Sequence, residues 1–99
     1  MKNKLRLKLY KKDLKLPMNF ENLKFDNYEL KDNDKMLSIY KNNKKIKEIW
    51  YHKNGQIAYE WNFKNEKLEG IQYSWWDDGK QHDRNCRMKW NYKNGILIE

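Results

Sequence analysis

The chain has 99 residues, of which 36% are charged and 15% aromatic, and its formal net charge is +8. This length predicts one domain, and the aromatic content is too high for a disordered chain. A single cysteine, Cys86, excludes an internal disulfide and indicates a reducing compartment. No apolar run reaches the ~7–15 residues of a signal peptide or the ~18 of a membrane helix, so we expect a cytoplasmic protein without a membrane partner.

Basic residues are concentrated at the N-terminus. Residues 1–20 hold seven basic groups and one acid, whereas the other 79 residues hold 15 basic groups and 13 acids. Residues 5–10, LRLKLY, alternate leucine with basic residues or tyrosine, which predicts a strand. A clustered positive field attracts polyanions, so this patch predicts contact with nucleic acid or with an acidic partner; the alternative is an edge strand protected from aggregation by lysines. The patch comprises Lys4, Arg6, Lys8, Lys11, Lys12 and Lys15.

Residues 18–35 follow Pro17, which ends the preceding element or starts a turn. Leu23 and Phe25 alternate on one side of Asp26-Asn27, and two further apolar residues alternate after it. This pattern favours a β-hairpin about Asp26-Asn27, and a short helix is the alternative. We therefore divide the single domain into residues 1–35, a basic extension of the sheet, and residues 36–99, a set of hairpin repeats.

Turn dipeptides recur through the C-terminal two-thirds of the chain. Asn-Gly and Asp-Gly suit two-residue hairpin turns, because Gly, Asn and Asp tolerate positive φ. Sequential short strands with tight turns pair antiparallel, so the sequence predicts an all-β meander in a single twisted sheet. The turn dipeptides are Asn42-Asn43, Asn54-Gly55, Asn65-Glu66, Asp78-Gly79 and Asn94-Gly95.

Aromatic residues alternate with polar ones between these turns. Residues 57–63, IAYEWNF, place Ile57 and three rings at every second position, and we predict that these four side chains form the core. Trp75 and Trp76 are consecutive, so on a strand they point to opposite faces. Trp76, or whichever of the two residues points outward, is the best aromatic candidate for a binding hot spot.

An internal repeat aligns three stretches, SIYKNNKK, WNFKNEKL and WNYKNGIL, with Tyr40, Phe63 and Tyr92 in register. A second set of turns, WYHKNGQ and SWWDDGK, lies between them, and the insertion QHDRNC at 81–86 interrupts the period. Residues 38–99 resemble a MORN-type repeat, in particular the antitoxin-like bacterial (YwqK-type) variant, although Asn65-Glu66 stands where that pattern has Asn-Gly. The resemblance implies a one-layered run of hairpins that binds other macromolecules and has no enzymatic activity.

The residue types give little support for catalysis. Cys86 and His82 could form a nucleophile pair only if the fold aligned them, and one cysteine with two histidines falls short of the four ligands of a structural zinc site. We therefore predict no enzyme, no cofactor and no small-molecule substrate. The predicted partner hot spot lies in and near the irregular unit and comprises Trp76, His52, His82, Arg84 and Arg87.

The sequence thus predicts a small binding protein, and its role stays open between three functions. The first is an inhibitor or antitoxin-like neutraliser of a larger protein. The second is an inhibitor of a nucleic-acid-guided nuclease, of the anti-CRISPR type, that contacts RNA or the nucleic-acid channel through the basic N-terminus. The third is a structural scaffold.

Overall fold

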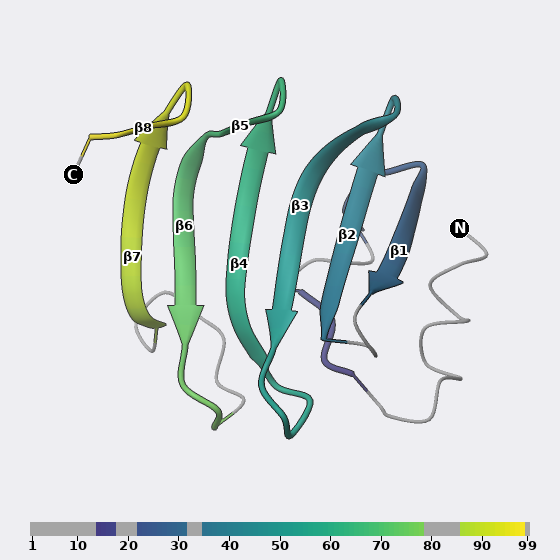
Figure 1. Ribbon diagram of the computed structural model, residues 1–99, viewed down its shortest axis with the longest axis vertical. Coiled ribbons are helices and arrows are strands. Elements are labelled where there is room, and N and C mark those ends of the chain that lie inside the picture. The colour runs from purple at the N-terminus through teal and green to yellow at the C-terminus, as the bar shows by residue number, and fades with distance from the viewer. Residues whose placement is uncertain (1–13, 18–21, 32–34, 79–85, 99) are drawn as a thin grey trace.

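The residues that the structure describes form eight antiparallel strands in one open sheet (Figure 1). The computed structural model describes residues 14–17, 22–31, 35–78 and 86–98, and no helix is present among them. The predicted all-β, antiparallel meander is therefore confirmed. The strands are β1 (Asn27–Lys31), β2 (Met36–Lys41), β3 (Lys44–Tyr51), β4 (Ile57–Lys64), β5 (Lys67–Leu68), β6 (Gly70–Trp75), β7 (Cys86–Lys93) and β8 (Ile96–Leu97). Their order is β1-β2-β3-β4-β6-β7-β8, and the short β5 pairs with β4.

Three two-residue turns join β2 to β3, β4 to β5 and β7 to β8. Both residues of each turn have positive φ, as a tight hairpin of this kind requires: Asn42-Asn43, Asn65-Glu66 and Asn94-Gly95. The Asn54-Gly55 turn differs from the prediction. It is a five-residue connection, 52–56, in which Gly55 alone has positive φ and its amide donates to His52 O. The Asp78-Gly79 turn extends beyond the described residues.

One face of the sheet carries the aliphatic core, and we call it the covered face. Leu37, Ile39, Ile49, Ile57 and Trp75 are at most 1% exposed. Leu14 and Phe25, which lie outside the strands, pack into the same cluster and cover it. Their contribution explains how one sheet excludes water from its own core.

The covered face also holds a buried ion pair. Lys47 on β3 donates to Glu60 on β4, and both side chains are largely shielded from solvent. Lys47 also donates to the side-chain oxygen of Asn62, at 2.6 Å. A buried charge needs a close opposite charge and further hydrogen bonds, so these three side chains form one coupled polar group beside the apolar core.

The pairing between β4 and β6 is interrupted, and a side chain bridges the gap. Backbone pairing spans only Tyr59–Ser74 and Glu60–Tyr73, because β5 then takes the edge of β4. Gln72, which is fully buried, accepts a hydrogen bond from the backbone N–H of Asn62 and donates to Gly70 O at 3.0 Å. Its amide therefore replaces the missing backbone pairing.

The predicted hairpin about Asp26-Asn27 is wrong. Residues 23–25 form no strand, and β1 pairs with β2 instead, with Asn27 opposite Tyr40. Phe25 enters the core and Asp26 accepts a hydrogen bond from the backbone N–H of Asn42. The alternation around Asp26 was too short to distinguish a strand from a segment that inserts one ring into the core. The predicted strand at 5–10 lies outside the described residues.

Candidate functional site

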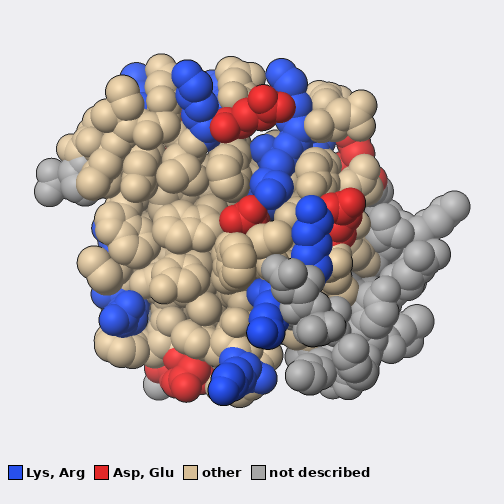
Figure 2. All heavy atoms as spheres, in the orientation of Figure 1, with Lys and Arg blue, Asp and Glu red and all other residues tan. Residues whose placement is uncertain are grey.

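The second face of the sheet, the open face, presents aromatic side chains. Trp50, Tyr59, Trp61, Met88 and Trp90 come from β3, β4 and β7 and project to this face, because paired residues of neighbouring strands share a face. Tyr59 is 37% exposed and Met88 46% exposed, and the three tryptophans are half-buried. Figure 2 views this side and shows a broad area without Lys, Arg, Asp or Glu.

A β-bulge decides which face the rings occupy. Across β3 and β4, Trp50 pairs with Tyr59 but Tyr51 pairs with Ile57, so Ala58 is an extra residue in β4. A bulge of this kind breaks the alternation of side chains. Ile57 therefore enters the core, whereas Tyr59, Trp61 and Phe63 point to the open face. The prediction that all four form the core is wrong for these three rings.

The rings of the open face contact one another. Tyr59 and Trp61 stack with centroids 5.5 Å apart and planes at 10°, and Trp61 lies 5.6 Å from Trp90. Gln72 pairs with Trp90 between β6 and β7, and it is fully buried. Three buried polar residues of this face, Ser38, Gln72 and Ser74, form its floor, and the rings form its surface.

Charge at the edge of these rings is neutralised locally. Glu48 on β3 accepts a hydrogen bond from Trp50 Nε1 at 2.9 Å and another from Lys45 Nζ at 2.7 Å. The Lys45 ammonium also lies 6.0 Å from the centroid of Phe63. The aromatic centre is consequently depleted in free charge, which is typical of the centre of a protein–protein interface.

A second feature, the Trp76 corner, lies at the end of the open face where β6 finishes. It comprises His52, Trp76, Asp77 and Arg87. Trp75 is 1% exposed and Trp76 is 54% exposed, so Trp76 is the residue of this pair that points outward. The Arg87 guanidinium lies 5.3 Å from the centre of the Trp76 ring, close enough for a cation–π interaction.

Hydrogen bonds fix the Trp76 corner to the preceding hairpin. His52 Nε2–H donates to Trp75 O at 2.9 Å, and the side chain of Asn54 donates to Asp77 O at 2.9 Å. A hollow of about 220 Å³ lies between these residues and extends to Tyr59. The corner is therefore continuous with the open face, and hydrogen bonds from His52 and Asn54 join it to the 52–56 connection between β3 and β4.

The structure brings together three of the predicted hot-spot residues, His52, Trp76 and Arg87, around this hollow. His82 and Arg84 lie outside the described residues. The basic patch also lies outside them except for Lys15, whose backbone N–H donates to Gly55 O and whose carbonyl accepts from Tyr51. The patch residues not described are Lys4, Arg6, Lys8, Lys11 and Lys12.

Sequence reasoning missed four rings of the open face: Trp50, Tyr59, Trp61 and Trp90. A signal was present, because Leu37, Ile39 and Ile49 supply aliphatic side chains sufficient for the core of a small sheet. Where aliphatic residues fill one face of a sheet, the aromatic residues that alternate with them along the strands belong to the other face.

The remaining candidate nucleophile and metal ligands do not gather in the part of the chain that the structure describes. Cys86 is half-buried beside the core, and no three of His, Cys, Asp and Glu gather among the described residues as a metal site would require. No described helix is long and apolar enough to cross a membrane. Comparisons with protein-family models, curated proteins and solved structures found no match to this chain.

Proposed function

We propose that this chain is a small non-enzymatic protein that binds a larger protein through the open face and the Trp76 corner. The exposed Trp76, continuous with a charge-depleted area of rings, carries the proposal. Contiguous exposed apolar surface of this kind marks interaction sites in soluble proteins. Tryptophan and arginine are the residues most enriched in binding hot spots, and Trp76 and Arg87 lie in contact here.

A folded protein partner fits this surface better than a polyanion does. The centre of the face contains rings and methionine, and its nearest acid, Glu48, is already bound by Lys45 and Trp50. Such a surface matches the apolar core and polar rim of a protein interface. The resemblance to antitoxin-like MORN repeats supports the same role, so we propose that binding inhibits or neutralises the partner.

Affinity capture with a matched pair of variants tests this function. Trp76→Ala should weaken capture of one stoichiometric partner by about 30-fold or more, as expected for a hot-spot tryptophan. Ile71→Ala, which removes another exposed apolar side chain from a different position, should leave capture unchanged. The captured partner should then lose its own activity when mixed with an equimolar amount of this protein. Equal capture by both variants would refute the assignment of the surface.

A further inference from the structure

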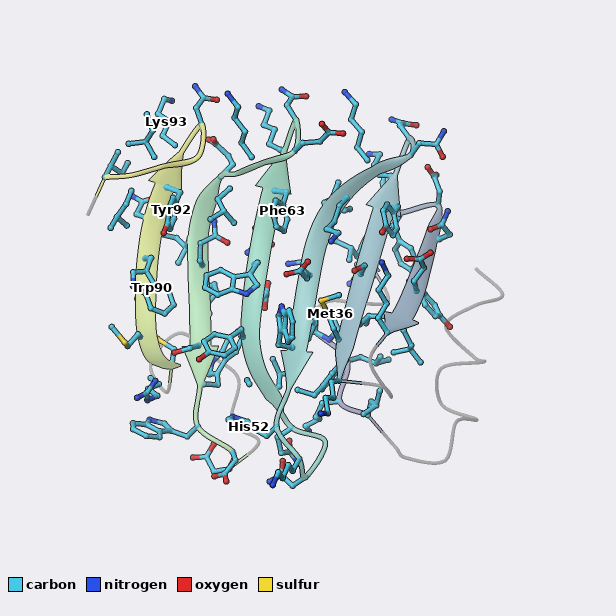
Figure 3. All side chains as sticks on the ribbon, viewed as in Figure 1. Met36, His52, Phe63, Trp90, Tyr92 and Lys93 are labelled. Atoms are coloured by element: carbon cyan, nitrogen blue, oxygen red, sulfur yellow. The ribbon has the colours of Figure 1, made fainter. Side chains whose placement is uncertain are left out.

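The three two-residue turns form a basic edge of the sheet, which we call the hairpin-tip row. The β2–β3, β4–β5 and β7–β8 tips lie along one end of the sheet, the upper end in Figure 1. Six of the 22 Lys and Arg residues of the chain flank these turns. They are Lys41, Lys44, Lys45, Lys64, Lys67 and Lys93. Figure 2 shows Lys and Arg along this upper margin, and Lys93 stands there in Figure 3.

Each tip repeats the same unit. Tyr40, Phe63 and Tyr92 immediately precede the first lysine of their hairpins, and Phe63 and Tyr92 are seen on the viewed side of Figure 3. All three rings are half-buried and lie on the side of the open face. The internal repeat thus places an aromatic ring on the open side of a strand end and a lysine on the opposite side of the same strand end, at three points along one edge of the sheet.

The acids near this row are largely engaged. Asp26 accepts from the backbone N–H of Asn42, and Glu69 accepts from the backbone N–H of Asn94 at 2.9 Å. Glu48 binds Lys45, which leaves Glu66 as the remaining acid in the turns themselves. Asp26 and Glu69 therefore cap turn amides, Glu48 pairs with Lys45, and Glu29 accepts from the Tyr40 hydroxyl at 3.3 Å. Six lysines thus flank turns that contain one acid, Glu66.

A hollow lies between the first two tips. Its volume is about 460 Å³, and its lining includes the ring of Phe63 and four lysines, with no acid among the residues that form it. The lining lysines are Lys41, Lys44, Lys45 and Lys64. Lysine binds phosphate as a point charge, and the ring of Phe63 offers a surface on which a base can stack.

We propose that the hairpin-tip row binds single-stranded nucleic acid, with phosphates on the lysines and bases against Tyr40, Phe63 and Tyr92. From β2 to β8 the row crosses five strand spacings, about 24 Å at ~4.8 Å each. One small anion would fill only the first hollow, whereas a chain of phosphates satisfies the whole row. Alternating lysines and rings combine the two contacts by which single strands bind, charge along the backbone and stacking of bases.

Fluorescence anisotropy with the full chain tests this site. The probe is a labelled oligonucleotide of about 12 nucleotides, within the ~4–16 nucleotides that such surfaces cover. The tip variant Lys44→Gln/Lys64→Gln/Lys93→Gln removes one lysine from each hairpin. The control Lys31→Gln/Lys35→Gln/Lys53→Gln removes the same charge from exposed lysines outside the tips. The tip variant should bind at least about ten-fold more weakly and show a salt dependence smaller by about two in slope, because three phosphate contacts are lost.

A second variant tests the rings, with circular dichroism to verify folding. Phe63→Leu/Tyr92→Leu keeps apolar volume but removes two stacking surfaces, and it should lower affinity by about ten-fold or more. The proposal would be overturned if the oligonucleotide did not bind at low salt or if the tip and control variants lost affinity equally. It would also be overturned if duplex DNA or polyglutamate competed as well as the single strand does. Trp76→Ala should leave oligonucleotide binding unchanged, so this result is separable from that for the protein partner.

Discussion

Gln72 should contribute far more to stability than a glutamine on a small sheet normally does. Its amide replaces missing pairing between β4 and β6 by accepting from Asn62 N–H and by donating to Glu69 O at 3.2 Å and Gly70 O at 3.0 Å. Gln72→Met keeps the length of the side chain and removes all three hydrogen bonds. The Asn62 N–H cannot easily reach water in their place, because the side chain is fully buried beneath the rings.

The size of the effect follows from these groups. A buried polar group left without a partner costs about 1–3 kcal/mol, so we expect Gln72→Met to reduce the free energy of unfolding by about 3 kcal/mol. For a domain of this size, that corresponds to a fall in Tm of about 12 °C or more. Urea denaturation measures the loss, and hydrogen exchange should show faster opening at the Asn62 amide in particular.

Gln56→Met is a matched control, because the side-chain oxygen of Gln56 accepts no hydrogen bond from a described residue. It should leave the free energy of unfolding unchanged or raise it, because the substitution removes a buried polar atom that has no partner among the described residues. If Gln72→Met were equally mild and exchange at Asn62 were unchanged, a role for Gln72 in joining β4 to β6 would be refuted.

Three further substitutions test other parts of the fold. Lys47→Met should lower the free energy of unfolding, measured in urea, by about 3 kcal/mol, because it leaves the Glu60 carboxylate buried without its partner. Adding Glu60→Leu to this variant should restore much of the loss. Additive losses from the two substitutions would contradict the coupling of Lys47 and Glu60. Glu66 has a φ of 67°, so Glu66→Gly should stabilise by about 0.5–1 kcal/mol in the same assay and Glu66→Ala should not. Burial raises the pKa of the Tyr51 hydroxyl well above its usual value, so the unfolded chain loses this proton at a lower pH than the folded chain does. The stability of the wild type relative to Tyr51→Phe should therefore fall as the pH rises above about 10. A difference in stability that does not change with pH would argue against this effect of burial.

Much of the fold follows from local chemistry. Asn42-Asn43, Asn65-Glu66 and Asn94-Gly95 adopt the positive φ angles that the turn pattern predicts. The period-two alternation of side chains predicts strands at the positions where the structure has β4, β6 and β7. The opposite orientation of Trp75 and Trp76 also follows from the strand geometry alone. These features depend on residues that are close together in the sequence, so they can be predicted from the sequence alone.

The candidate sites are less predictable, because they depend on which side of the sheet is covered. His52 and Arg87 are 35 positions apart in the sequence, and the hollow at Trp76 exists only once β3, β4, β6 and β7 are in register. The sequence predicted Trp76 as a hot spot from its neighbour, but the continuity of this corner with Tyr59 comes from the tertiary structure.

The sequence by itself determines that this protein is an antiparallel sheet of short hairpins, with a ring and a lysine at each of three tips. Only the tertiary structure decides which rings are buried. The extra residue Ala58 shifts the alternation within β4, and Leu14 and Phe25 cover the aliphatic face, so Tyr59 and Trp61 remain on the open side. The bulge depends on pairing between β3 and β4, and the covering residues come from outside the strands. No local sequence pattern therefore specifies which face of the sheet is exposed to water.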